Sequence, residues 1–240
     1  MTSDPQFRYA GSELGLFAKA VNWKAYWASH VGALLGPRVL DVGAGLGATV
    51  KMLCGPQHTR WLALEPDAEM AAMLARDAAA GLLPGACEVR AGMIGDLGAS
   101  EQFDTILYID VLEHIEADQA ELERAAGHLA PDGHIIILSP AHQWLYTPFD
   151  RALGHFRRYD RATLTAATPN TLKIERIFYL DSAGMLASMG NRFALNAAHP
   201  TEQQILLWDR VLVRTSQLVD PLLRYRVGKS IVGVWRKRAT

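Results

Sequence analysis

The sequence predicts an α/β fold in which a mostly parallel sheet is covered by helices on both faces, giving three layers. Short leucine-rich or β-branched runs recur along the 240 residues, with helix-like stretches between them. Near-continuous apolar runs are typical of parallel strands that are buried on both faces. The first run also leads directly into a glycine-rich turn, as in many nucleotide-binding α/β proteins.

The elements of the first half can be placed one by one. A helix is expected at residues 14–35, before the first strand. Pro66 opens a second helix that runs to about residue 80, before Gly81, and a third spans about 115–129 and ends at the turn 131–133. The expected strands are 38–42, 60–64, 87–90, 103–109 and 134–138.

The pattern changes beyond Pro140. Residues 141–159 are rich in aromatic, histidine and arginine side chains without clear periodicity, which indicates a functional loop. Strands are expected at 172–180 and 230–235, with helices between them. We find no repeat and no linker, so we predict one domain over 1–240: a helical cover (1–36), a core (37–180), a helical insertion (181–228), and a last strand with a tail (229–240).

Composition narrows the function. The hydrophobic fraction is 50%, which is typical of a folded globular domain, and the formal net charge is −1. Without excess positive charge, sequence-independent binding to nucleic acid is disfavoured. The two cysteines cannot build a disulfide framework, no run is long enough to span a membrane, and the first residues lack a signal-peptide pattern. We therefore expect a cytoplasmic protein with neither nucleic acid nor a membrane as partner.

The strongest local signal is the segment 39–48, a buried strand followed by a glycine loop. Glycines there permit positive φ and let a ligand approach the bare backbone. Glu65 ends the next strand, where a carboxylate can accept hydrogen bonds from both ribose hydroxyls of a nucleoside cofactor. Glycine-rich turns are common, but the order of strand, loop, helix and acidic strand end favours a nucleoside cofactor.

Two cofactor classes fit this loop. Gly43, Gly45 and Ala48 satisfy the dinucleotide pattern of glycine, any residue, glycine, two residues, then glycine or alanine, which keeps a nicotinamide-dependent oxidoreductase as an alternative. A module that binds a cofactor without chemistry is a third possibility. Asp41, two residues before the first glycine, favours a different family.

Residues 39–47 resemble the first motif of the class I S-adenosylmethionine-dependent methyltransferases. Later segments resemble further motifs of that family in the same order: 64–67, 92–97, 103–106, 111–115 and 129–134. The resemblance spans roughly residues 38–140. It implies a Rossmann-like three-layer sandwich with a seven-stranded sheet, in which the last strand, 230–235, is antiparallel. It also implies methyl transfer from S-adenosylmethionine to a small metabolite, with S-adenosylhomocysteine as the product.

The resemblance also assigns the cofactor contacts. Asp41 and the glycine loop would hold the methionine part, Glu65 with Pro66 the ribose, and Met93 with Ile94 the adenine. The main chain at Asp110 and Val111 would border the methionine amine. The adenine contact could instead shift to Asp96. The loop residues in this set are Gly43, Ala44, Gly45 and Gly47.

Acceptor-side residues should follow the carboxyl ends of the strands. His155, His114 and Glu113 are the candidate catalytic residues. Asp110, Glu113 and His114, with a distant His155, resemble a constellation of ubiquinone-pathway and small-RNA O-methyltransferases, some of which use a divalent metal, although the first residue here is Asp rather than Glu. A histidine base, a site for Mg²⁺, Mn²⁺ or Zn²⁺, and a structural role all stay open; we assign no metal ligands.

Residues 154–159, Gly-His-Phe-Arg-Arg-Tyr, resemble a motif of bacterial small-molecule methyltransferases. The two arginines could grip an acidic group, or one could form a salt bridge to Asp150 or Asp160. Tyr26, in a stripe with Trp23 and Trp27, is either core packing or an aromatic wall of the pocket. The candidate substrate-binding residues are Tyr26, His142, Tyr146, Arg157, Arg158 and Tyr159.

Overall fold

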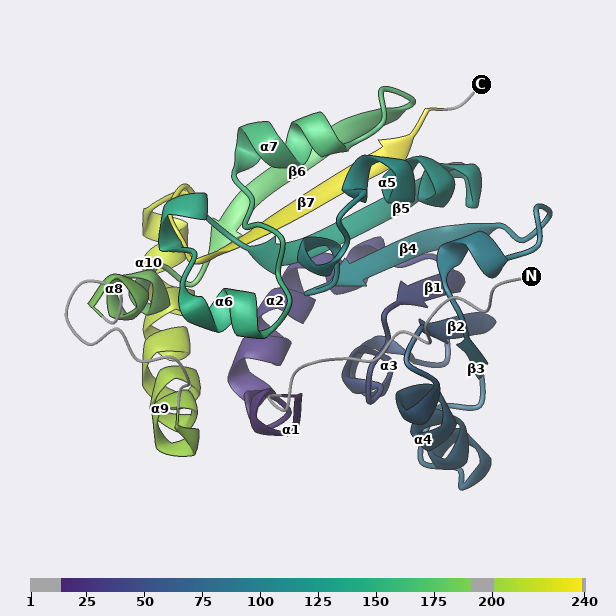
Figure 1. Cartoon of the computed structure of the whole chain (residues 1–240), viewed down its shortest axis with the longest axis horizontal. Helices are drawn as coiled ribbons and strands as arrows, with labels where there is room; N and C mark the ends of the chain where they lie inside the picture. The colour runs from purple at the N-terminus through teal and green to yellow at the C-terminus, as the bar shows by residue number, and fades with distance from the viewer. Residues whose placement is uncertain (1–13, 191–200, 239–240) are drawn as a thin grey trace.

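A computed structural model describes residues 14–190 and 201–238 of the chain. A single twisted sheet runs through the middle, with helices against both of its faces (Figure 1). No helix in these two ranges has the length and apolar character needed to cross a bilayer. The predicted three-layer α/β architecture is therefore confirmed.

The sheet has seven strands in the order β3-β2-β1-β4-β5-β7-β6. β1 to β5 pair in parallel, whereas β7 pairs antiparallel with both β5 and β6. This confirms the antiparallel last strand. The strands are β1 (Arg38–Val42), β2 (Arg60–Glu65), β3 (Cys87–Ala91), β4 (Phe103–Ile109), β5 (Leu129–Pro140), β6 (Leu172–Leu180) and β7 (Ser230–Lys237).

Two apolar clusters fill the spaces between the sheet and its helices. α5 and α7 close one cluster, and α2, α3, α4 and α10 the other. The α-helices are α1 (Leu14–Phe17), α2 (Val21–Val31), α3 (Ala48–Leu53), α4 (Ala68–Ala79), α5 (Asp118–Gly127), α6 (Pro148–Ala152), α7 (Arg161–Ala167), α8 (Ser182–Gly190), α9 (Glu202–Leu207) and α10 (Val213–Leu222). The short 3-10 helices are η1 (Gly32–Leu34), η2 (Ile94–Asp96), η3 (Leu112–His114) and η4 (Gln143–Leu145). A π-helical segment, η6 (Trp208–Leu212), lies between α9 and α10.

Three predicted boundaries were wrong. The helix expected at 14–35 is interrupted between α1 and α2. The helix expected at 115–129 begins only at Asp118, because the chain first makes the 3-10 turn η3 and a short link after it. The turn expected at 131–133 lies inside β5. Leu129 and His134, on either side of it, both pair with β4, and the register of the ladder shifts between them. Asp132, within this irregularity, has a φ of +61°.

The segment 141–159 is more ordered than a plain loop. It contains η4 and the short helix α6, and a parallel bridge between Ala141 and Tyr159 closes it. The N–H of Phe156 also donates to the carbonyl of Glu113 at 2.8 Å. These backbone bonds hold the segment over the carboxyl ends of β4 and β5.

Buried carboxylates join the helices that lie between β6 and β7 to α2. Asp209 accepts hydrogen bonds from the backbone N–H groups of Asn22 and Trp23, so it satisfies donors at the start of α2. Asp220 accepts from the Tyr26 hydroxyl at 2.9 Å and from the Asp181 N–H at 2.8 Å. α2 and the helices that follow β6 therefore form one connected cover.

Candidate active site

The glycine loop joins β1 to α3 at the carboxyl edge of the sheet. Gly45 has a φ of +54°, and a Cβ built on it would meet no atom within 4 Å. At Gly43 a Cβ would instead lie 2.7 Å from Val111. Packing thus explains Gly43, while Gly45 borders open space that a ligand can enter.

Glu65 at the end of β2 is bonded directly to this loop. Its Oε2 accepts a hydrogen bond from the Gly45 N–H at 2.7 Å, and its Oε1 accepts from the Asp67 N–H at 2.8 Å. Burial raises the pKa of this carboxyl, although both hydrogen bonds oppose the shift. Each oxygen keeps a second lone pair, so Glu65 can still accept from ribose hydroxyls. The adjacent Pro66 leads into α4, which Asp67 caps.

Asp41 lies in β1, just before the glycine loop, and is 1% exposed. Its Oδ2 has no hydrogen-bond partner among the described residues. Burial raises its pKa to about 7, and the neighbouring Trp61 indole acts in the opposite direction. An unpaired buried carboxylate oxygen is costly, and a cationic or N–H group of a ligand would satisfy it.

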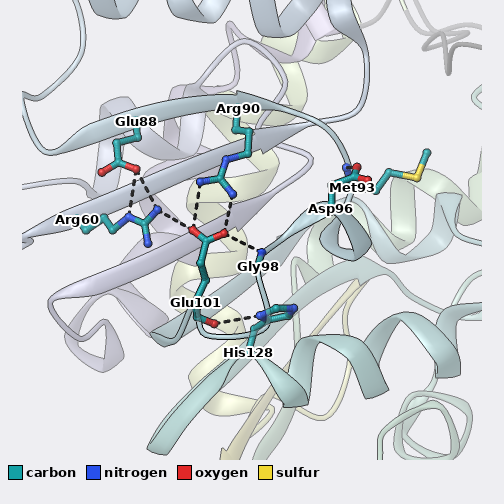
Figure 2. A network of polar contacts seen from close by, with 8 residues as sticks. All are labelled: Arg60, Glu88, Arg90, Met93, Asp96, Gly98, Glu101 and His128. Carbon is teal, nitrogen blue, oxygen red and sulfur yellow. Dashed lines mark hydrogen bonds and ion pairs between the residues drawn. The ribbon is translucent and has the colours of Figure 1, made fainter.

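The loop after β3 is fixed by a polar network centred on Glu101 (Figure 2). Arg90 and Arg60 both pair with the Glu101 carboxylate, which also accepts from the Gly98 N–H at 3.0 Å. These bonds, led by that from Arg90, lower the pKa of Glu101 to about 2. The network is thus charged at neutral pH and anchors the base of the loop.

At the tip of this loop, the Met93 N–H donates to Asp96 at 2.8 Å (Figure 2). The Met93 side chain is exposed, whereas Ile94 is buried in the core. Of the two predicted adenine contacts, Met93 offers a free side chain. Ile94 can offer only its backbone, because its apolar side chain is packed beneath the turn.

Asp110, directly after β4, has a φ of +54°. Its surface is exposed, yet the surrounding protein raises its pKa to about 6 by desolvation, and charged His155 would lower it. Val111 packs against Gly43. The structure therefore brings the predicted residues after β4 up to the glycine loop.

Glu113 is fully buried and accepts a hydrogen bond from the Ser139 hydroxyl at 2.9 Å. Its other oxygen, Oε1, has no partner among the described residues. Burial, and then the charge of Asp110, raise the pKa of Glu113 well above its usual range. Burial therefore disfavours the charged form of this carboxyl.

His155 is paired with a buried carboxylate. Its Nδ1 lies 3.0 Å from Oδ1 of Asp150, which is also bonded by Nε of Arg158 at 2.7 Å. Burial alone would raise the pKa of Asp150, but the bonds from His155 and Arg158 outweigh it and hold the pKa below its usual value. When the ring carries a single proton, the charged Asp150 favours its placement on Nδ1, and Nε2 then keeps its lone pair.

His114 stands against this pair, with its ring nearly perpendicular to that of His155 and the centroids 4.6 Å apart. Burial, followed by the neighbouring His155, lowers its pKa to about 4, so His114 is neutral at pH 7. Glu113, His114 and His155 each offer one ligand atom, and these atoms lie within 4.8 Å of one another. This set could hold a divalent metal.

The other predicted acceptor residues are engaged with the protein. The Tyr26 hydroxyl bonds to Asp220 and that of Tyr159 to Asp118. His142 stacks on Tyr179, with Nε2 3.1 Å from the Gly228 carbonyl, and the Tyr146 hydroxyl donates to the His155 carbonyl. Arg157 pairs with Asp118, and Arg158 forms the alternative salt bridge to Asp150 that the sequence left open. Each of these six side chains therefore has a partner within the protein.

Three further residues at this edge were missed as site residues. Asp150 lies five residues before His155. A search for an acidic partner close to this histidine in the sequence would have found it. Ser139 lies in β5, and Lys229 precedes β7. No local pattern marks the last two, because only the strand order places them beside β4.

The glycine loop with Glu65 and the Asp150–His155 pair thus lie at one edge of a Rossmann-like sheet. Residues 40–135 match a family model described as a methyltransferase domain. The curated relatives are ubiquinone biosynthesis O-methyltransferases. The one from Rhodopseudomonas palustris (strain HaA2) is 29% identical over 121 residues, which cover 49% of this chain and 45% of the relative. The one from Bradyrhizobium sp. (strain ORS 278) is 30% identical with the same coverage. The chain spans about half the length of these relatives.

Solved structures share the fold at low identity. The [4+2]-cyclase SpnF has a TM-score of 0.63 at 14% identity, covering 100% of both chains. An S-adenosylmethionine-dependent methyltransferase from Mesorhizobium loti has a TM-score of 0.60 at 16% identity, covering 93% of this chain and 100% of that one. The family match identifies a methyltransferase domain over residues 40–135, and these solved structures share the fold of the chain.

Proposed function

We propose that this protein transfers a methyl group from S-adenosylmethionine to a hydroxyl group of a small molecule. One observation carries the proposal. Gly45, open to ligand space and bonded to Glu65, stands at the same sheet edge as the Asp150–His155 pair. A nucleoside cosubstrate and a proton acceptor can therefore meet above the ends of β1 and β4.

The residues present fit the cosubstrate. Asp41 has an orphaned buried oxygen, Gly45 leaves space that a Cβ would fill, and Glu65 keeps lone pairs for ribose hydroxyls. Met93 offers an exposed side chain for the adenine. Together with Gly43, Ala44, Gly47, Pro66, Ile94, Asp110 and Val111, these would form the binding surface. We propose that the whole described chain works as one unit in which α2 and α8 to α10 cover that surface.

When bound, S-adenosylmethionine supplies an electrophilic methyl group on a sulfonium. Positioning provides much of the rate of such an in-line displacement. The hydroxyl acceptor loses its proton to Nε2 of His155, while Asp150 stabilises the imidazolium that results. His114, neutral and packed on His155, and the buried Glu113 orient the base. The general base contributes about 10²–10⁴-fold to such reactions.

The curated relatives support an oxygen acceptor, since both are named O-methyltransferases. The near-neutral charge supports a small acceptor rather than nucleic acid. We place the reaction in the cytoplasm, on the same composition and the unpaired Cys54 and Cys87. A nicotinamide oxidoreductase is not favoured by the family match, and a binding module without chemistry would leave the Asp150–His155 pair unused.

Calorimetry with S-adenosylhomocysteine and with NADH tests the proposal. We expect S-adenosylhomocysteine to bind and NADH not to bind. Turnover is then followed with labelled S-adenosylmethionine and a panel of hydroxylated, amine and thiol acceptors. Binding of NADH alone would overturn the proposal, and binding of S-adenosylhomocysteine without turnover of any acceptor would favour the module.

The cluster of Glu113, His114 and His155 favours a second version of the reaction, assisted by a metal at these side chains. EDTA treatment separates the two versions. Base catalysis predicts full activity after EDTA, whereas metal assistance predicts loss of activity and recovery with Mg²⁺, Mn²⁺ or Zn²⁺.

A further inference from the structure

Lys229 is a partly buried cation at the edge of the sheet where the proposed acceptor would lie, with 23% of its side chain exposed. Its backbone is fixed on both sides: its carbonyl accepts from the Ala141 N–H at 2.7 Å, and its N–H donates to the Asp181 carbonyl at 3.3 Å. It therefore sits directly beyond the end of β5. Asp110, after β4, lies on the other side of that strand end, since its N–H donates to the Leu138 carbonyl.

Among the described residues, the ammonium of Lys229 contacts one aromatic ring and one carboxylate. Its Nζ lies 3.8 Å from the centroid of the Trp208 ring and 3.4 Å from Oδ2 of Asp181. Over residues 14–190 and 201–238, Asp181 is the only carboxylate within 4 Å of this nitrogen. Three N–H donors thus share one acceptor and one ring face.

Asp181 does not need Lys229 for its own hydrogen bonding. It already accepts from Trp208 Nε1 at 2.6 Å, from the Ser216 hydroxyl at 2.8 Å and from the Gly184 N–H at 3.0 Å. Lys229 makes the longest of these four contacts. The ion pair with Asp181 therefore leaves the partly exposed ammonium of Lys229 with donors that a bound anion could accept from.

The charges that face Lys229 come from several elements. Asp181 follows β6, Asp110 follows β4, and Arg158 belongs to the segment over β5. Burial lowers the pKa of Lys229, with Asp181 and Asp110 opposing the shift and Arg158 adding to it. A singly charged anion suits this balance, whereas a doubly charged phosphate would meet both aspartates.

We propose that Lys229 binds a carboxylate of the methyl acceptor, so that the enzyme acts on small hydroxylated carboxylic acids. The inference rests on the proposed function, because it assigns the substrate class of the same site. His155 would take the proton of the acceptor hydroxyl, while Lys229 would hold the acid group beyond the end of β5.

Matched acceptor pairs test the charge preference of the native protein loaded with S-adenosylhomocysteine. The pairs are 4-hydroxybenzoate with 4-hydroxybenzamide and glycolate with glycolamide, with glycerol 3-phosphate against glycerol as the phosphate arm. We expect the carboxylate member of at least one pair to bind about 10- to 100-fold more tightly than its amide. Equal binding, binding of neither member, or preference for the phosphate alone would overturn the inference.

Variants then assign the preference to one residue. Lys229→Met should abolish the preference for the acid and leave binding of the amide unchanged, while Lys229→Arg should keep part of it. Lys173→Met, an exposed lysine in β6, is the matched control and should change nothing. A Lys229→Met variant that still prefers the acid would overturn the inference.

A competing role for Lys229 is binding of the cosubstrate's own carboxylate. 5′-Methylthioadenosine, which lacks the amino acid part, separates the two roles. If Lys229→Met weakened S-adenosylhomocysteine but not 5′-methylthioadenosine, the acceptor role would be wrong and the proposed function would stand. If the native protein bound neither nucleoside, the proposed function would fail, whereas the acid–amide comparison could still be made on the protein alone.

Discussion

Nδ1 of His155 lies 3.0 Å from Oδ1 of Asp150, and this carboxylate is 1% exposed. Arg158 holds the same carboxylate through two further hydrogen bonds. The imidazole is therefore fixed in one tautomer by a group that stays charged. This relationship gives His155 an oriented lone pair, and it explains why Arg158 is not available to an acceptor.

His155→Ala should lower the methylation rate about 10²–10⁴-fold with little change in affinity for S-adenosylhomocysteine, because the ring takes the acceptor proton but does not contact the nucleoside. Single-turnover rates and calorimetry measure the two quantities. His134→Gln, at the opposite edge of the sheet, is the control. If His155→Ala kept the native rate, catalysis would depend on positioning alone.

Gly45→Val should weaken S-adenosylhomocysteine binding by more than about 100-fold. The side chain would enter the space next to Gly45, and a β-branched residue at a φ of +54° is strained by roughly 1–3 kcal/mol. Calorimetry and thermal unfolding measure the two effects separately. Gly85→Ala, where a Cβ also meets no atom within 4 Å, should leave binding intact. Native affinity in the Gly45 variant would mean that the loop is misassigned.

Asp41→Asn should stabilise the ligand-free protein at pH 8 more than at pH 5. The folded-state pKa is about 7 against an ordinary value of 3.8, so raising the pH between these values ionises Asp41 in the unfolded chain first and lowers the free energy of unfolding. Asn removes this loss, which is on the order of 2 kcal/mol. Urea unfolding at both pH values measures it, and a pH-independent difference between the two proteins would contradict the raised pKa.

Glu101→Gln should lower the free energy of unfolding by about 1–2 kcal/mol at pH 7, because two arginines lose their charged partner. The folded-state pKa of about 2 lies below the ordinary value of 4.5, so the stabilisation is present above pH 4.5 and is lost as the pH falls towards 2. The difference should therefore be smaller at pH 4.

Glu88→Gln is the matched control for the Glu101 variant, since Glu88 bonds only Arg60 in this network and its side chain is 55% exposed (Figure 2). An exposed pair of this kind contributes at most about 1 kcal/mol. Equal losses for the two variants in urea unfolding would show that the network does not depend on Glu101.

The sequence predicted the features that short segments encode. The glycine loop and Glu65 follow from strand patterns and spacing, and the family resemblance supplied the antiparallel β7. Boundaries failed where tertiary pairing overrides local signals, as in the turn at 131–133 that β4 draws into β5.

The acceptor side was harder to predict, because its parts come from distant segments. Lys229 and Asp110 are brought together only by the placement of β7 next to β5. Tyr26 and Arg157, two of the predicted substrate-binding residues, bond to Asp220 and Asp118, partners that lie far away in the sequence.

The position of β7 has a consequence for how the chain assembles. β7 is the last strand along the chain, yet it lies between β5 and β6 and pairs with both (Figure 1). Until residues 230–237 emerge from the ribosome, β6 has no neighbour in the sheet and β5 keeps an open edge. The sheet edge that carries Lys229 therefore cannot form during synthesis of the preceding residues. A truncation before Ser230 would leave two unpaired strand edges, which favour aggregation.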